Sequence, residues 1–98
     1  MDSQLVYKLL RKIPRGKVTT YKALAMACGN PKAVRVVGST LKRNKTLITI
    51  PCHRVVRSDG KVGGYVLGTT KKIELLQKEG VEIKNGKVGE RFIISKID

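Results

Sequence analysis

Cys52 and His53, the single histidine of the sequence, stand side by side in the segment Ile50-Pro51-Cys52-His53-Arg54-Val55-Val56. A cysteine thiolate is a strong nucleophile at neutral pH, and a nearby base increases the thiolate fraction. Pro51 restricts its own φ and disfavours a helical conformation at Ile50, so we expect a short buried strand or a taut loop here. By itself, the pair is equally consistent with a cysteine that packs as a small hydrophobic side chain.

The charge of the chain is strongly basic. Its 98 residues include 21 lysines and arginines against 7 acidic residues, which gives a net charge of +14. Such a charge favours polyanionic partners, with nucleic acid first and anionic membrane surfaces second. The alternative is a lysine-rich solvated surface of the kind found in heat-adapted proteins. The length predicts one domain, residues 1–98, with a modest core.

Hydropathy and cysteine usage point to an intracellular protein. No apolar run approaches the roughly 20 residues of a membrane-spanning helix, and no secretory signal is recognisable. Cys28 and Cys52 stand in unrelated contexts without a C-x-x-C motif, which argues against a disulfide framework and against a zinc site. We therefore expect a reducing, cytoplasmic compartment in which Cys52 remains a usable thiol.

Three predicted helices precede the Cys52 segment and are expected to position it. Hydrophobic residues recur at helical spacing over three ranges, 2–13, 21–28 and 31–43. Thr19 or Thr20 offers an N-cap for the second helix, and Asn30 offers one for the third, with Pro31 at its first position. The second and third helices, joined by a tight turn, predict a helix-turn-helix over about 20–43.

The third helix has two distinct faces. Its inward face is predicted to bury Val34, Val37 and Leu41. Its outward face carries small and basic residues, namely Arg35, Gly38, Ser39 and Lys42. A glycine inside a helix costs about 1 kcal/mol relative to alanine. Something therefore approaches Gly38 closely: either a phosphate backbone or base edge, or a neighbouring helix at a crowded crossing.

The second half of the chain predicts one more helix and two strands. Thr69 or Thr70 is the predicted N-cap of a helix that continues through Glu79, and the short strands cover 81–83 and 92–94. Asn85-Gly86 between the strands is typical of a hairpin turn. The sequence therefore predicts a predominantly helical α/β fold, a small domain with a winged-helix-like helix-turn-helix and a short strand hairpin.

Several motifs together resemble the O6-alkylguanine-DNA alkyltransferases. Residues 50–56 closely resemble their active-site signature. The family pattern is also echoed in segments 29–38, 63–65, 75–76 and 79–80, and by Asn44. The resemblance covers about residues 5–80 and implies the catalytic and DNA-binding half of such a protein. The smaller N-terminal domain that is common in the family is absent from this sequence.

The resemblance implies DNA repair by alkyl transfer. The alkylated guanine leaves the duplex, and Cys52 displaces the alkyl group in an irreversible, single-turnover SN2 reaction. No cofactor and no metal are implied. His53 acts on the thiol through a water molecule, and Glu79 orients and charges His53, so we expect a thiol pKa well below the free value. Asn44 stabilises the turn that holds the active-site segment.

The resemblance also implies how DNA is bound. Arg35 matches the arginine finger that fills the position of the flipped base, and Tyr21 matches a tyrosine that pushes on its phosphate. A helix-turn-helix usually reads the major groove, whereas the family binds the minor groove, which suits Gly38 and Ser39. Basic contacts are expected from Lys42 and Arg43. The protein is expected to bind double-stranded DNA as a monomer.

The substrate pocket is implied by the same resemblance. Tyr65 lines it, and backbone groups of Cys52 and Val55 recognise the guanine edge. Many relatives carry a polar residue where this chain has Val66, so one recognition hydrogen bond is in doubt.

Three other functions compete with alkyl transfer. An alkyltransferase-like protein would flip and flag the lesion without removing it, but such relatives replace the cysteine. A plain basic DNA-binding domain leaves the Pro-Cys-His-Arg segment unexplained. A cysteine hydrolase would need direct contact between Cys52 and His53, together with an oxyanion hole.

Overall fold

The computed structural model describes residues 2–45 and 49–97. Its helices are α1 (Ser3–Leu10), α2 (Tyr21–Ala27), α3 (Val34–Lys42) and α4 (Thr69–Lys78), with 3₁₀ turns η1 (Cys52–Arg54) and η2 (Glu90–Phe92). Its strands are β1 (Val18–Thr20), β2 (Val55–Val56), β3 (Ile83–Lys84), β4 (Lys87–Val88) and β5 (Ile93–Ile94). The predicted α/β class, with helices predominating, is confirmed.

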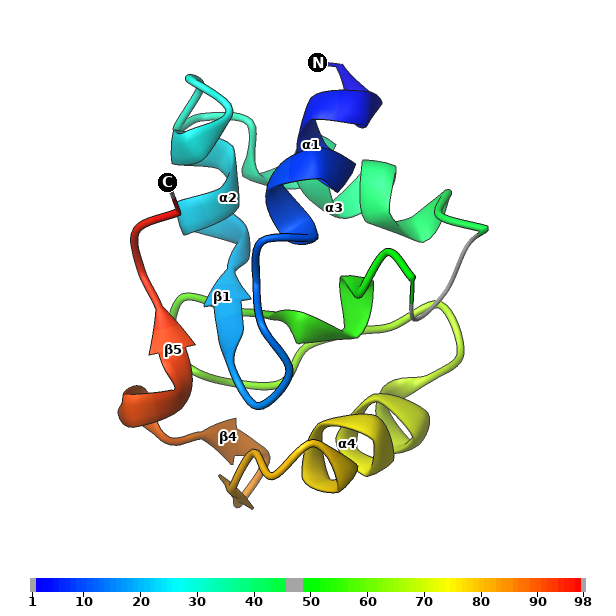
Figure 1. Cartoon of the computed structure of the whole chain (residues 1–98), viewed down its shortest axis with the longest axis vertical. Coiled ribbons are helices and arrows are strands. Elements are labelled where there is room, and N and C mark those ends of the chain that lie inside the picture. Colours follow the sequence, from blue (N-terminus) through cyan, green and yellow to red (C-terminus); the bar gives the residue numbers. More distant parts are fainter. Residues whose placement is uncertain (1, 46–48, 98) are drawn as a thin grey trace.

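A small parallel sheet separates two groups of elements. Its strand order is β2-β1-β5, while β3 and β4 form a separate antiparallel pair. In Figure 1, α1, α2 and α3 lie above this sheet, and α4 and the β3–β4 hairpin lie below it. The segment that contains Cys52 enters the sheet as β2, so it lies between the two groups.

The first two helices follow the sequence prediction. The Asp2 carboxylate caps α1 by accepting from the Gln4 amide at 2.9 Å, and the helix ends at Leu10, three residues before the predicted end. Thr20 caps α2, and its hydroxyl accepts from the Ala23 amide at 3.0 Å. Each cap satisfies a backbone donor that would otherwise lack a partner in the first turn.

The third helix begins later than predicted. The Asn30 side chain accepts from the Lys32 amide at 3.2 Å, and the Asn30 carbonyl accepts from the Ala33 amide at 3.0 Å. These bonds form a turn that competes with the helix, so α3 starts at Val34. The predicted burial of Val34 is wrong, since its side chain is 36% exposed, whereas Val37 and Leu41 are buried as predicted.

The predicted pairing of the C-terminal strands is partly wrong. Asn85-Gly86 does form the turn of a hairpin, with positive φ at both residues, but the paired strands are β3 and β4. The strand predicted over 92–94 pairs elsewhere, because β5 lies parallel to β1, with Val18 opposite Ile93. The strand on the other side of β1 therefore comes from residues about 75 positions away along the chain.

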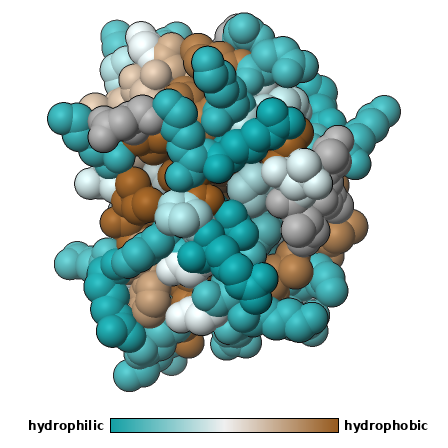
Figure 2. Space-filling view, viewed as in Figure 1, coloured by the Kyte–Doolittle hydropathy of each residue, from teal (hydrophilic) through white to brown (hydrophobic). Residues whose placement is uncertain are grey.

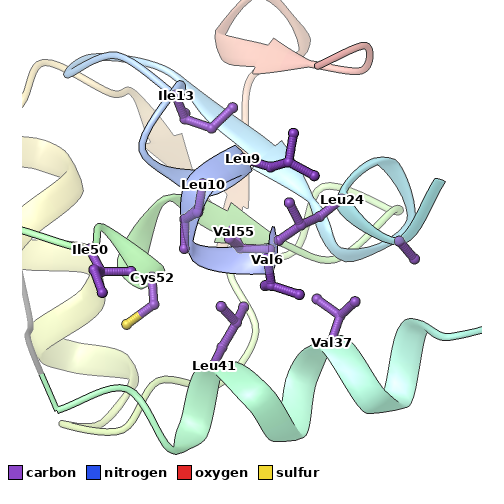
Figure 3. Close-up of a cluster of buried hydrophobic side chains, with 11 residues drawn as sticks. Val6, Leu9, Leu10, Ile13, Leu24, Val37, Leu41, Ile50, Cys52 and Val55 are labelled. Atoms are coloured by element: carbon purple, nitrogen blue, oxygen red, sulfur yellow. The ribbon is translucent and has the colours of Figure 1, made fainter. Parts of the chain in front are cut away.

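Two hydrophobic clusters hold these elements together. The larger one joins α1, α2 and α3 to the Cys52 segment, through Val6, Leu9, Leu10, Ile13, Leu24, Ala25, Val37, Leu41, Ile50, Cys52 and Val55. Figure 3 shows Cys52 at one end of it, beside Ile50, with its sulfur on the side of the helix that carries Leu41. The smaller cluster, below the sheet, contains Val18, Val56, Val62, Leu76, Val81 and Val88. Cys52 is thus fixed by the main core.

The surface reflects the basic composition. Hydrophilic side chains cover much of the face seen in Figure 2, and hydrophobic side chains show between them. Within residues 2–45 and 49–97, no helix has the length and apolar character needed to cross a membrane. The same residues contain no group of three or more His, Cys, Asp or Glu side chains arranged to hold a metal ion.

Candidate active site and nucleic-acid interface

The backbone around Cys52 is turned, not extended. Pro51 has φ −79° and ψ 64°, and the Cys52 amide donates to the Ile50 carbonyl at 2.8 Å, which is the geometry of an inverse γ-turn. Cys52 then begins η1, so the strand or taut loop expected at this residue is wrong and the strand starts at Val55. The Asn44 side-chain amide donates to the same Ile50 carbonyl at 3.0 Å. Two donors therefore hold the turn that presents the thiol; the segment that leads into it includes residues 46–48, which lie outside the described residues.

Cys52 lies in the wall of a pocket of about 470 Å³. The pocket is lined by residues from α2, α3, η1 and the loop before α4: Tyr21, Val34, Arg35, Gly38, Ser39, Leu41, Lys42, Cys52, Gly64, Tyr65 and Val66. Its volume falls in the range of pockets that bind small ligands. The outward face predicted for the third helix therefore shares one pocket with the thiol.

His53, the residue after Cys52, lies in a buried polar cluster. Its side chain is fully buried, and Nε2 lies 3.1 Å from Glu79 Oε2. Arg54 donates to both oxygens of the same carboxylate, with Nε to Oε1 at 3.0 Å and Nη2 to Oε2 at 2.7 Å. A carboxylate held by a two-point guanidinium contact has little freedom to rotate, so its position relative to the imidazole is fixed.

The end of α4 positions Glu79. Glu79 is the C-cap residue, and Gly80 after it has φ 91°, a left-handed conformation that glycine adopts at low cost. The Gly80 amide donates to the Gln77 carbonyl and the Val81 amide donates to the Leu76 carbonyl, both at 3.0 Å. This is a Schellman motif, and the burial of Leu76 and Val81 in one cluster completes it.

The protonation states of this cluster follow from burial and pairing. Burial lowers the pKa of His53 and outweighs the opposite effect of Glu79, so the imidazole is neutral at pH 7. Burial acts against ionisation of Glu79, but hydrogen bonds from Arg54 and His53 keep its pKa below the ordinary value. A carboxylate accepts, so the geometry assigns the proton of the neutral ring to Nε2. Nδ1 is then a base; it is buried and has no hydrogen-bond partner among the described residues.

The thiol itself is less acidic than expected. Burial raises the pKa of Cys52, although a hydrogen bond from Asn44 and the nearby charge of Lys72 act in the opposite direction. The depressed pKa predicted from the sequence is therefore wrong for the structure without substrate. A buried thiol of this kind becomes a nucleophile when a base takes its proton, and His53 is the neighbouring base.

Lys72 is a site residue that sequence reasoning missed. It is fully buried, and its Nζ donates to the carbonyls of Val55 at 2.6 Å and Gly64 at 3.0 Å. The ammonium group also lies 5.8 Å from the centre of the Tyr21 ring, and burial lowers the pKa of Lys72 to about 8. The signal was present in the sequence, because Lys72 lies four residues before the buried Leu76 and so falls on the same helix face.

Comparison with known proteins identifies the family. The sequence pattern described as "6-O-methylguanine DNA methyltransferase, DNA binding domain" matches residues 2–81. The chain belongs to this family. It is 49% identical over 94 residues to a bifunctional methyltransferase/endonuclease of Picrophilus torridus, covering 95% of this chain and 32% of the relative. It is 48% identical over 77 residues to the human methylated-DNA–protein-cysteine methyltransferase, covering 79% of this chain and 37% of the relative. The chain thus spans about a third of the length of these two relatives.

Solved structures of the methyltransferase family show the same fold. The Mycobacterium tuberculosis OGT in complex with DNA matches 79% of this chain and 48% of its own, at 40% identity with a TM-score of 0.76. S. pombe Atl1, in complex with damaged DNA that contains O6-carboxymethylguanine, matches 94% of this chain and 93% of its own. That second match has 29% identity and a TM-score of 0.82.

Two of the expected residues, Val55 and Arg43, are not among the residues described as lining the pocket. Val55 is fully buried in the main core and is not among the residues described as lining the pocket. Its carbonyl accepts from Lys72, so the backbone recognition expected there would have to share this oxygen with the ammonium group. Arg43 follows the end of α3 and donates to the Thr40 hydroxyl at 3.3 Å, also outside the described lining.

The structure also bears on two further expectations, the close approach at Gly38 and the missing hydrogen bond at Val66. A Cβ built at Gly38 would meet no described atom within 4 Å, so the crowded helix crossing is wrong and the glycine faces open space in the pocket wall. Val66 lies at the mouth, 46% exposed, where it offers no hydrogen bond. Tyr65 lines the pocket, and its hydroxyl is buried without a partner among the described residues. An unsatisfied buried hydroxyl in a pocket wall is suited to bind a polar ligand atom.

Proposed function

We propose that this chain repairs O6-alkylguanine in DNA by transferring the alkyl group to Cys52, once per molecule. The observation that carries the proposal is the position of Cys52. The thiol lies in one pocket with four outward residues of α3, and the next residue along the chain, His53, is buried and paired with Glu79. A small-ligand pocket with a nucleophile at its wall, continuous with a basic helix face, suits a base that has left a duplex.

The proposed reaction is an SN2 displacement. The sulfur of Cys52 attacks the alkyl carbon, a C–S bond forms, and the bond between that carbon and O6 breaks. The electron pair of the broken bond stays on the guanine, which takes up a proton from water and remains in the DNA strand as unmodified guanine. The product is a thioether on Cys52, which leaves this sulfur without a free thiol for a second transfer.

The thiol proton needs an acceptor. His53 is neutral, and its Nδ1 is the buried base of the site, so we assign to it the thiol proton, received through a water molecule. Glu79 stabilises the imidazolium that results, because its carboxylate already holds Nε2 at 3.1 Å. Lys72 stabilises negative charge on the sulfur, because its ammonium group lowers the pKa of Cys52.

The DNA-binding part of the proposal rests on α3. Arg35, Gly38 and Ser39 lie along the wall that also contains the thiol, so a duplex laid on this helix would bring a base to the pocket. The open space at Gly38 allows a close approach of the groove floor, which favours the minor groove. Arg35 is then positioned to fill the space that the flipped base leaves.

A second candidate function is lesion binding without transfer. It is favoured by the likeness to S. pombe Atl1, which covers nearly the whole of both chains. Cys52 distinguishes the two functions, because lesion binding alone makes no use of a nucleophile beside a buried base. Its position in the pocket wall is the reason for preferring transfer.

Intact mass spectrometry tests the proposal. Duplex DNA with one O6-methylguanine should add one methyl group to the protein, and peptide mapping should place it on the peptide that contains Cys52. Cys52→Ala should bind the same DNA and remain unmodified. Cys28→Ala is the matched control, since Cys28 is half-buried outside the described pocket lining, and it should react like the parent. Binding without any mass increase in the parent would favour lesion binding, and more than one equivalent of product would exclude a single-turnover reaction.

A further inference from the structure

A second groove adjoins the pocket. It is about 470 Å³ in volume and is lined by Tyr21, Val34, Arg57, Ser58 and Asp59. Tyr21 and Val34 line the pocket as well, so the two depressions share a wall. The proposed alkyl transfer uses neither Arg57 nor Asp59, although both lie next to its binding site.

The stem of Arg57 is held in place by the backbone around it. The Arg57 amide donates to the Lys61 carbonyl at 2.9 Å, which closes the turn between β2 and the Gly63 segment. A Cβ built at Gly63 would lie 3.3 Å from Arg57 Cγ and 3.8 Å from Tyr21 Cε2. The aliphatic stem therefore lies against the Gly63 backbone, close to the ring that divides the pocket from the groove.

The guanidinium end of Arg57 is paired but exchangeable. Nη2 lies 3.3 Å from Asp59 Oδ2, and the two side chains are 57% and 41% exposed. Ion pairs this exposed contribute little to stability, so a better ligand can replace the carboxylate. Asp59 is fixed by its own bond, since Oδ1 accepts from the Lys61 amide at 3.0 Å. That bond, with the cations around it, holds the pKa of Asp59 below its ordinary value, so the group is anionic at neutral pH.

We propose that this groove receives a backbone phosphate of the DNA strand whose base enters the pocket, and that Arg57 exchanges Asp59 for that phosphate. The inference rests on the proposed function, because it assumes that a flipped nucleotide occupies the adjoining pocket. A strand that places its base beyond Tyr21 must carry its phosphates past the same ring, and the groove lies on the other side of that ring. Arginine suits this contact, since its planar fork matches two phosphate oxygens. Asp59 weakens binding, because it competes for Arg57 and repels the phosphate.

The test compares Arg57 with a matched arginine elsewhere. Arg91 forms a similar exposed pair, with Nη2 3.1 Å from Glu82 Oε2, and lies outside the described linings of both depressions. In a Cys52→Ala background, which binds without reacting, Arg57→Gln should weaken binding of a short duplex with one O6-methylguanine about tenfold and reduce the slope of log Kd against log salt by about 1. Arg91→Gln should change the affinity much less. Equal effects of the two substitutions would overturn the proposal.

Asp59 provides a test of opposite sign. Asp59→Asn keeps an oxygen for the Lys61 amide and removes the charge, so it should tighten duplex binding about threefold. Glu82→Gln removes the matched carboxylate and should give a smaller gain. In an Arg57→Gln background the gain from Asp59→Asn should shrink, because part of it comes from the freed guanidinium. If Asp59→Asn increased the duplex affinity no more than Glu82→Gln does, the proposed replacement of Asp59 by a phosphate at Arg57 would be refuted.

A third measurement separates this inference from the proposed function. Free O6-benzylguanine has no phosphate, so Arg57→Gln should react with it at the parent rate. A slower reaction would mean that the substitution disturbs the pocket itself, and would overturn the assignment of Arg57 to the phosphate. A parent protein that gains no methyl group from the O6-methylguanine duplex would instead refute the alkyl transfer, while the duplex affinities of the Arg57 and Arg91 variants would still decide whether the groove binds a phosphate.

Discussion

The buried ammonium group of Lys72 should make the stability of the protein rise with pH between about pH 8 and pH 10.5. Burial lowers the pKa of Lys72 from 10.5 to about 8. Between these two values the unfolded chain holds a proton that the native state has released. Stability therefore increases with pH through this window, since the state that binds fewer protons is favoured. Below pH 8 both states are charged, and the full cost of burying the charge is present.

The size of the effect follows from the same two values. A pKa difference of one unit corresponds to about 1.4 kcal/mol, and integration from pH 7.5 to pH 9.5 gives a gain of about 2 kcal/mol from this residue. Lys72→Met keeps most of the side-chain volume and removes the ammonium group, so it should abolish this gain. Lys71→Met is the matched control, since it removes the same charge from a side chain that is 51% exposed. It should retain the gain.

Urea unfolding at pH 7.5, 8.5 and 9.5, at constant ionic strength, measures the three free energies of unfolding. The parent and Lys71→Met should gain about 2 kcal/mol relative to Lys72→Met between the lowest and highest pH. If the free energy of unfolding changed with pH in the same way in all three proteins, the lowered pKa of Lys72 would be refuted. Should Lys72→Met fail to fold, an NMR titration of Lys72 in the parent decides the question: a midpoint near 8 is expected, and a midpoint near the ordinary lysine value would refute it.

Three further predictions concern the proposed site. Glu79→Gln removes the carboxylate that stabilises a charged imidazole, so alkylation of Cys52 should slow about 100-fold, while the duplex affinity should not change. Stopped-flow rates and Kd values measure the two quantities, and an unchanged alkylation rate would exclude Glu79 from the mechanism. Arg35→Ala should slow repair of a methylated duplex far more than reaction with free O6-benzylguanine, whereas equal losses on the two substrates would mean that Arg35 is not the finger. Asn44→Ala removes one donor from the buried Ile50 carbonyl, so urea unfolding should show a loss of about 1–3 kcal/mol, and unchanged stability would mean that this bond does not hold the turn.

The parts of the site that the sequence predicts are those fixed by local pattern. The helical spacing of Val37 and Leu41 sets which side of α3 faces the core, and this alone turns Arg35, Gly38 and Ser39 outward. Thr20 caps α2 through a bond that spans three residues. Such features depend on neighbours within one or two turns of helix, so the sequence contains most of the information that determines them.

The parts that the sequence does not predict depend on distant contacts or on burial. The pairing of β1 with β5 joins residues about 75 positions apart, and no local signal selects it over a hairpin. The start of α3 depends on a competition between the Asn30 side chain and the helix backbone. Burial of the Cys52 segment is expected from the sequence, but the raised pKa of Cys52 also depends on how far burial outweighs the hydrogen bond from Asn44 and the charge of Lys72, and the motif does not contain that balance. Lys72 was missed because a charged residue on an apolar helix face is ordinarily assigned to solvent.

Burial shifts the pKa of Cys52 and the pKa of His53 in opposite directions, and this bears on how the proposed nucleophile is protected before it reacts. It raises the pKa of the thiol and lowers that of the imidazole, so the proton stays on sulfur in the absence of substrate. A neutral pair costs less to bury than a thiolate–imidazolium pair, and a protonated thiol resists oxidation. The proposed reaction then needs two stabilising charges: the Glu79 carboxylate beside the imidazolium of His53, and the Lys72 ammonium group near the sulfur of Cys52. In the proposed reaction the negative charge moves from sulfur to the departing O6, so the ion pair is needed only while the alkyl group is being transferred.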